Sequence, residues 1–148
     1  MHRLAFGLVA VLLVGCAPSE EAAPADEVAM VPAGLSAADL MGTWTVTSTP
    51  AGSDSVVTYT MMATADPSTW TVQFEGLDPM PAYVTFDGDS VMISFGPFES
   101  RLRAGVMVTA EGVSRLSGDM LMGTFTAHYQ TTEADSVLRG TTHGTRVP

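Results

Sequence analysis

The sequence contains no lysine, and its positive side chains are six arginines. Against sixteen aspartates and glutamates these give a formal net charge of -10 at neutral pH. An acidic chain repels the phosphate backbone of nucleic acids, and no basic stripe with interleaved aromatic residues offsets this charge. We therefore expect no nucleic acid among the partners.

Cysteine and histidine are almost as scarce. Cys16 is the only cysteine in 148 residues, which excludes an intramolecular disulfide and a thiolate zinc site. Beyond His2, only His128 and His143 offer an imidazole, and no serine in a Gly-x-Ser-x-Gly turn accompanies them. The sequence therefore predicts a chain that is not an enzyme and needs no cofactor or metal.

Long apolar runs are missing after Cys16. Before it, a short basic start precedes an apolar run over residues 4–14, and Gly15 supplies the small residue that a signal peptidase requires. The run is shorter than the about 20 residues needed to cross a bilayer. Residues 1–15 are thus predicted to be a removable export signal, whose loss also removes Arg3.

Residues 13–16, Leu-Val-Gly-Cys, resemble the bacterial lipobox. This resemblance implies that the thiol of Cys16 is diacylated, that the signal is cut before it, and that the new N-terminus receives a fatty acid such as palmitate. Ala17, rather than Asp, is similar to the pattern sent to the outer membrane in enteric bacteria. We therefore expect an exported lipoprotein, anchored in the cell envelope through Cys16, at the outer membrane facing the periplasm.

Residues 16–34 are expected to form a flexible acidic linker after the lipidated cysteine. Three prolines, four acids and many small residues cannot bury enough apolar area to fold. The remaining residues, 35–148, are long enough for one small domain.

From residue 42 onward, apolar residues recur at every second position, as at Trp44 and Val46 or Trp70 and Val72. This alternation is typical of half-buried antiparallel strands. A helical turn capped by Ser36 is expected before them, over residues 35–41. Turn residues separate the strands, and turns are expected at Gly96-Pro97 and Glu111-Gly112 as well. The predicted strands cover residues 42–48, 55–63, 69–74, 82–86, 91–95, 100–103, 105–110, 113–116, 120–130 and 136–142.

This pattern predicts an all-β domain, a single small antiparallel up-and-down barrel of eight to ten strands. A barrel is favoured over a sandwich because closure removes the two exposed edges of the sheet. Glycines at 42, 105, 123 and 140 are also typical of strand bends at barrel corners.

Gly42-Thr43-Trp44, after a short helical turn, resembles the first strand of the lipocalin-like (calycin) barrels. The resemblance implies that Trp44 lies at the closed end of the barrel beneath an arginine from near the last strand. Arg139 and Arg146 are the two candidates for this structural role. The chain is shorter than a lipocalin and lacks the disulfide common there, so a smaller relative of that fold is expected.

A small barrel either fills its interior with side chains or leaves room for one ligand. If a cavity exists, we expect its ligand-binding residues to be Tyr59, Trp70, Phe74, Tyr83 and Tyr129, because Tyr and Trp combine apolar area with a polar group. The leading hypothesis is therefore non-catalytic binding of a small apolar or amphipathic ligand. The alternative is a packed barrel that acts as a structural or protein-interaction module, with an envelope protein as its partner.

Two further patterns leave alternatives open. Met120, Met122 and His128 share one strand face and could hold a soft Cu(I) ion, although methionine is also a common core filler. Arg101 and Arg103, two residues apart beside Glu99, could form a small anion site or pair with acids across strands.

Overall fold

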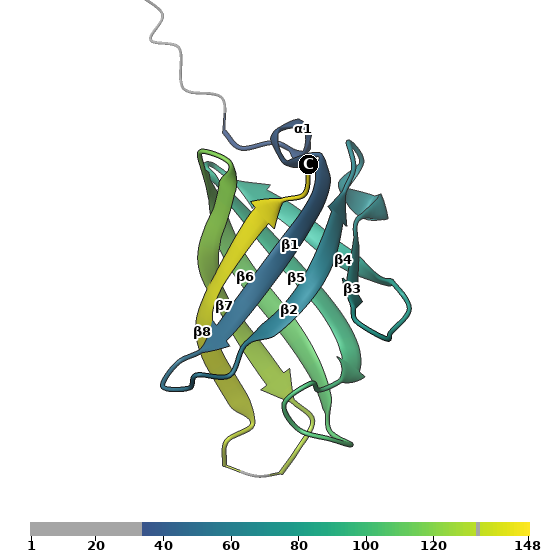
Figure 1. Cartoon of the computed structure of the whole chain (residues 1–148), viewed down its shortest axis with the longest axis vertical. Coiled ribbons are helices and arrows are strands. Elements are labelled where there is room, and N and C mark those ends of the chain that lie inside the picture. The colour runs from purple at the N-terminus through teal and green to yellow at the C-terminus, as the bar shows by residue number, and fades with distance from the viewer. Residues whose placement is uncertain (1–33, 133) are drawn as a thin grey trace, which may run out of the picture. The chain divides into compact units, whose positions relative to one another are not determined.

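The structure is a computed structural model that describes residues 34–148 except residue 133. The predicted signal, Cys16 and the linker as far as residue 33 lie outside the described residues. Within them the chain forms one short α-helix, one 3-10 turn and eight strands (Figure 1). Their bounds are α1 Ala37–Leu40, β1 Gly42–Pro50, β2 Val57–Ala63, η1 Pro67–Thr69, β3 Thr71–Phe74, β4 Met80–Asp87, β5 Ser90–Glu99, β6 Met107–Ser117, β7 Met120–Tyr129 and β8 Val137–Arg146.

The eight strands form one closed antiparallel barrel in which each strand pairs with the next along the chain. β8 closes the barrel by pairing with β1, with Trp44 opposite Arg146 and Pro50 opposite Gly140. The predicted all-β, up-and-down barrel is thereby confirmed, and it is compatible with a lipocalin-like fold. Closure pairs every described strand with two neighbours, which limits edge-to-edge association, although β3 and β4 pair at only two positions, Thr71 with Pro81 and Val72 with Met80.

The prediction that Gly96-Pro97 ends a strand is wrong, because β5 continues to Glu99 through a bulge between Phe95 and Phe98. The bulge shifts the alternation by one residue, so that Phe95 and Phe98 both face the interior. Gly96 makes this possible: its φ is +113°, and a Cβ there would lie 2.9 Å from the Val108 carbonyl oxygen.

Two further strand predictions need correction. Glu111-Gly112 is not a turn but the middle of β6, where Gly112 pairs with Ile93 on one side and Phe125 on the other. Pairing on both edges holds this segment extended and overrides its turn-like composition. Residues 100–103, predicted as a strand, instead belong to the connection between β5 and β6.

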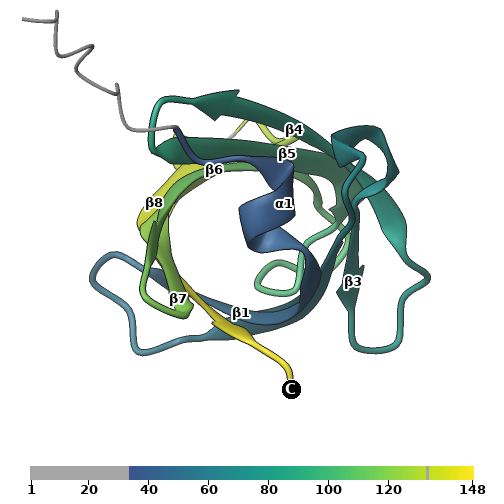
Figure 2. The same cartoon turned by 90° about the horizontal axis from the view of Figure 1, so that it is seen from above.

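One end of the barrel, here called the closed end, is covered by α1 (Figure 2). Ser36 occupies the N-cap position of α1, as predicted, and the Asp39 carboxylate accepts hydrogen bonds from its N–H (2.9 Å) and its hydroxyl (2.6 Å). Leu40 follows directly, packs into the barrel and is fully buried with Trp44 and Trp70.

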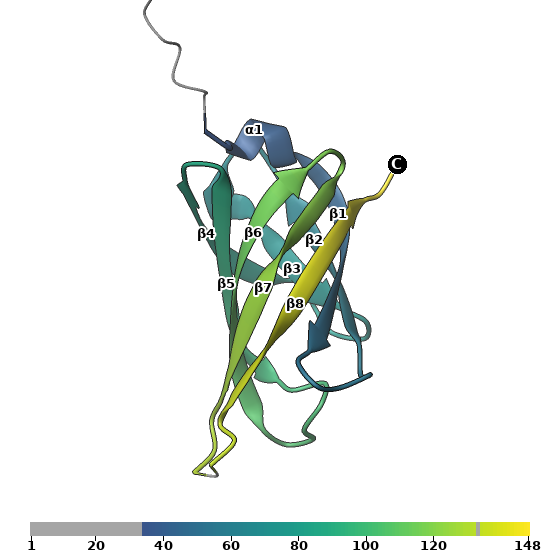
Figure 3. The same cartoon turned by 90° about the vertical axis from the view of Figure 1, so that its left-hand side faces the viewer.

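The opposite end, here called the open end, carries the β1–β2, β3–β4, β5–β6 and β7–β8 connections. Figure 3 shows the last two extending beyond the strands on the side away from α1. No helix covers this end in the part of the chain described, so the space between the strands reaches the connecting loops.

Candidate ligand-binding cavity

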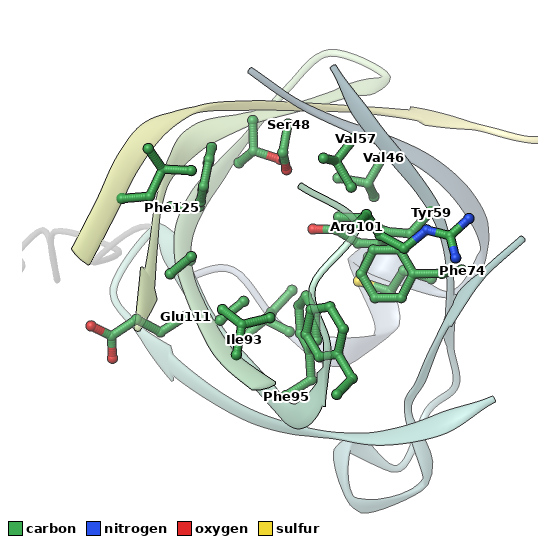
Figure 4. A pocket seen from close by; sticks show the side chains of 18 of the residues that line it. Val46, Ser48, Val57, Tyr59, Phe74, Ile93, Phe95, Arg101, Glu111 and Phe125 are labelled. Carbon is green, nitrogen blue, oxygen red and sulfur yellow. The ribbon is translucent and has the colours of Figure 1, made fainter. Parts of the chain in front are cut away.

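The barrel interior contains a cavity of about 80 Å³ that lies mostly in the open half, with a lining that extends to Met61 and Leu121 toward the closed end (Figure 4). Its wall draws on all strands except β4, together with the start of the β5–β6 loop, and most of it is apolar. The lining includes Val46, Ser48, Tyr59, Phe74, Phe95, Phe98, Arg101, Phe125, Tyr129 and Thr142.

The closed half is filled rather than hollow. Trp44, Trp70 and Leu40 are completely buried there, and the ring of Phe86 meets Trp70 edge-on at 6.1 Å. The Trp70 indole N–H donates to the Thr64 carbonyl at 2.8 Å, so its polar atom is satisfied within the protein. Packing and pocket therefore coexist, one in each half of the barrel.

Aromatic rings form one wall of the cavity. Phe74 stacks on Phe98 with ring centroids 4.7 Å apart, and Phe95 lies 5.6 Å from Phe98. Tyr59 contacts this group at 5.2 Å from Phe74. Such a wall offers a large apolar contact area at small cost in side-chain entropy.

A cluster of three hydroxyl groups interrupts the apolar lining on the β1–β2–β8 side. The Ser48 hydroxyl donates to Thr142 Oγ1 at 3.4 Å, and the hydroxyl of Tyr59 interacts with both side chains. Burial raises the pKa of Tyr59, and the hydrogen bonds to Ser48 and Thr142 offset this only in part. Tyr59 is only partly buried and lines the cavity. Because its pKa is raised, it presents a neutral phenol to the cavity at neutral pH.

The mouth of the cavity is formed by the β5–β6 loop, residues 100–106, which is held by its own hydrogen bonds. The Ser100 hydroxyl oxygen accepts from the N–H groups of Leu102 and Arg103, both at 3.1 Å, and Glu99 Oε1 accepts from Gly105 N–H at 2.9 Å. Arg101 and Leu102 are exposed and also line the cavity, so the cavity reaches the surface here.

Arg103 connects this loop to β7 and to the β7–β8 connection through two side-chain contacts. Its guanidinium carbon lies 4.1 Å from the Tyr129 ring centre, and one of its nitrogens lies 2.6 Å from the Asp135 carboxylate. The sequence left open whether Arg103 forms an anion site or pairs with an acid, and in the structure it pairs.

The five residues predicted to bind ligand are divided by the structure. Tyr59, Phe74 and Tyr129 line the cavity. Trp70 also faces the barrel interior, but it lies near the closed end, among the packed side chains, and does not line the cavity. Tyr83 needs correction: its side chain is 71% exposed on the outer surface. It alternates with Ala82, Val84 and Phe86, which face inward, so strand parity directs it outward.

The two arginine candidates for the closed end are also separated. Arg146 lies with its guanidinium carbon 4.4 Å from the Trp44 ring centre and donates to the Asp39 carbonyl at 2.8 Å and to the Met41 carbonyl. The Trp44 indole N–H donates to the Leu40 carbonyl at 2.8 Å. Arg139 is paired near the opposite end of β1 and is exposed, so it cannot reach Trp44 and that prediction is corrected.

The candidate metal and imidazole residues lie on the outside of the barrel. Met120, Met122, His128 and His143 are all exposed, and the His128 ring nitrogen lies 3.2 Å from Glu111 Oε1. Among the described residues, no group of three histidine, cysteine, aspartate or glutamate side chains converges.

Sequence reasoning missed Ser48, Thr142 and Phe98 as cavity residues. Ser48 shares the parity of Trp44 and Val46, so the alternation did carry a signal for it. Thr142 and Phe98 could not be recognised in this way, because the register of β8 and the bulge in β5 decide their positions.

Comparison with known proteins adds no relative: no family model, curated protein or solved structure matches the chain. Within residues 34–132 and 134–148, none of the helices has the length and apolar character to traverse a bilayer.

Proposed function

We propose that this protein is a non-catalytic binder of a small apolar or amphipathic molecule, which it holds in the open half of its barrel. The observation that carries this proposal is the cavity itself: aromatic and aliphatic walls with one cluster of hydroxyl groups at Ser48, Tyr59 and Thr142. Ligand sites are commonly of this kind, with an apolar lining and few polar groups that orient the guest.

The size of the cavity limits the ligand in its present shape. About 80 Å³ is several times the 10–15 Å³ that one water requires, and about half of an engineered cavity that takes up benzene. A small ring or a short chain fits, whereas a longer chain needs the β5–β6 loop or the side chains at the mouth to move outward.

The proposed function includes the cell-envelope anchor. Cys16, lipidated and retained after cleavage of residues 1–15, would hold the barrel at a membrane surface, at the outer membrane facing the periplasm. The mass of the N-terminal peptide tests this directly: acyl chains on Cys16 are expected, and their loss, with release from the membrane fraction, in Cys16→Ser.

Native mass spectrometry of the full processed chain tests the binding function. The protein would be carried from its host membrane into lipid nanodiscs, so that no detergent competes for the cavity. We expect a reproducible added mass that is lost in Ala127→Phe, a variant that fills the cavity from β7. A bare protein mass, unchanged after addition of lipid extract, would refute the proposal.

A second candidate function is docking of another envelope protein on the outer surface, and an exposed apolar patch favours it. Met92 on β5 lies directly opposite Val113 on β6, and Tyr83 on β4 lies diagonally beside Met92. All three are exposed, and they line a shallow groove. A photo-crosslinker at position 113 should capture one defined partner in intact cells under this candidate, whereas one at Thr43 should not.

A further inference from the structure

Arg101 and Arg139 are the two arginines of the described residues whose side chains have no partner, and of these Arg101 lies at the cavity mouth. Arg103 pairs with Asp135, Arg115 lies 3.3 Å from Asp89, and Arg146 binds two backbone carbonyls. For the part of the chain described, Arg101 forms no hydrogen bond or ion pair. It lines the cavity, and in Figure 4 its side chain runs toward the side where Tyr59 and Phe74 lie.

Three acidic side chains of this region interact with groups other than Arg101. Glu99 accepts the Gly105 N–H, and Asp135 pairs with Arg103. Glu111 also borders the cavity, but its carboxylate lies 3.2 Å from His128 and points away from the interior in Figure 4. Among the described residues Arg101 therefore forms no ion pair, although the chain as a whole is strongly acidic.

The loop also holds the backbone of Arg101 in a defined position. Its neighbours Ser100, Leu102 and Arg103 are fixed by the hydrogen bonds of the loop and by the contacts of Arg103 with Tyr129 and Asp135. A guanidinium carried on a fixed backbone presents a planar fork of N–H donors that matches a carboxylate, so that binding orders one side chain and not a whole loop.

We infer that the cavity selects amphiphiles that carry a carboxylate, with the apolar part inside the barrel and the carboxylate on Arg101. This inference rests on the proposed function and adds the charge of the ligand to it. The long-range repulsion expected from the acidic surface is screened over about 8 Å at physiological ionic strength. A carboxylate in contact with Arg101 is much closer than that, so the contact determines the preference.

A matched ligand series tests this inference. Pentanoate, pentanol and pentylamine have one short chain and three headgroups, and their affinities for the full chain in nanodiscs can be measured by calorimetry against empty nanodiscs. We expect pentanoate to bind most tightly and pentylamine most weakly. Arg101→Gln should weaken pentanoate about five- to tenfold and leave pentanol unchanged.

Arg139→Gln is the matched control, since it removes the same charge from the same half of the barrel but on its outer face. It should leave all three affinities unchanged. The resonance of pentanoate labelled with ¹³C at its carboxyl provides a second measurement: the pKa of the bound acid should be lower in the unsubstituted protein than in Arg101→Gln.

The outcomes separate this inference from the proposed function. Equal binding of pentanoate and pentanol, unaffected by Arg101→Gln, would overturn the inference while leaving the binding function intact. A preference for pentylamine, or equal weakening of all ligands in Arg101→Gln, would also overturn it. No binding by any carboxylate, alcohol or amine from the butyl to the decyl chain would refute both.

Discussion

Replacement of Arg146 by methionine tests how the closed end of the barrel is stabilised. The guanidinium of Arg146 lies 4.4 Å from the centre of the Trp44 ring and donates to the carbonyls of Asp39 and Met41. Methionine has a similar length and covers the indole with apolar atoms, but it provides neither the charge nor the donors. The substitution therefore removes the specific interactions and keeps most of the packing.

The expected cost follows from these contacts. A cation–π contact at an exposed site contributes about 0.5–1 kcal/mol. Each hydrogen bond to a backbone carbonyl is assigned about 1 kcal/mol, the value of an ordinary hydrogen bond, because the charge of Arg146 is exposed to solvent. Arg146→Met should thus lower the free energy of unfolding by about 2–3 kcal/mol, which corresponds to a fall in Tm of about 10 °C for a domain of this size.

Urea denaturation followed by far-ultraviolet circular dichroism measures this change, and Arg139→Met is the matched control. Arg139 lies on the same strand, is exposed, and contributes only its backbone carbonyl, which accepts from Ala51 N–H and survives substitution. Its replacement should alter stability by less than about 0.5 kcal/mol. Arg146→Lys should fall between the two, because one ammonium cannot stack on the indole as a plane. Equal losses for Arg146→Met and Arg139→Met would refute this account.

Three other predictions concern single positions. Gly140→Ala should lower the free energy of unfolding by about 2 kcal/mol, because a Cβ there would lie 2.8 Å from a backbone carbon of β1. Gly52→Ala has open space around it but a φ of +73°, so it should lower the free energy of unfolding by about 1 kcal/mol. Equal values for the two variants in urea denaturation would contradict this. Tyr59→Phe should lower stability by about 1 kcal/mol and make the cavity favour purely apolar guests, as calorimetry with benzene and phenol would show. The pKa of Asp39 is lowered by hydrogen bonds from Ser36, so its contribution to folding is complete above the ordinary carboxyl value of 3.8 and is lost as pH falls through the lower folded value. Ser36→Ala should reduce that loss in an acid titration of stability, and an unchanged titration would contradict the assignment.

The location of the cavity could be anticipated only in part. Alternation along each strand indicated that Tyr59, Phe74 and Tyr129 face inward, and the same alternation, read more closely, indicates that Tyr83 does not. Alternation says nothing of the height of a residue in the barrel. Trp70 and Tyr59 both face inward, yet one belongs to the filled half and the other to the cavity.

Other features arise from contacts between distant segments. The choice between Arg139 and Arg146 depends on the β1–β8 register, which places Arg146 opposite Trp44. The sequence also showed that Arg101 and Arg103 lie close together, but not that Asp135, 32 residues after Arg103, engages one and leaves the other at the cavity mouth.

The sequence by itself determined that the domain is all-β and that its strands form an up-and-down barrel beginning with a short capped turn. It could do so because a period of two and the turn residues between strands are local properties of the chain. Tertiary structure alone decided the register, the bulge in β5 and the division of the interior into a filled and a hollow half. These depend on pairing and packing between residues far apart in sequence, and such contacts leave no periodic signal in any single strand.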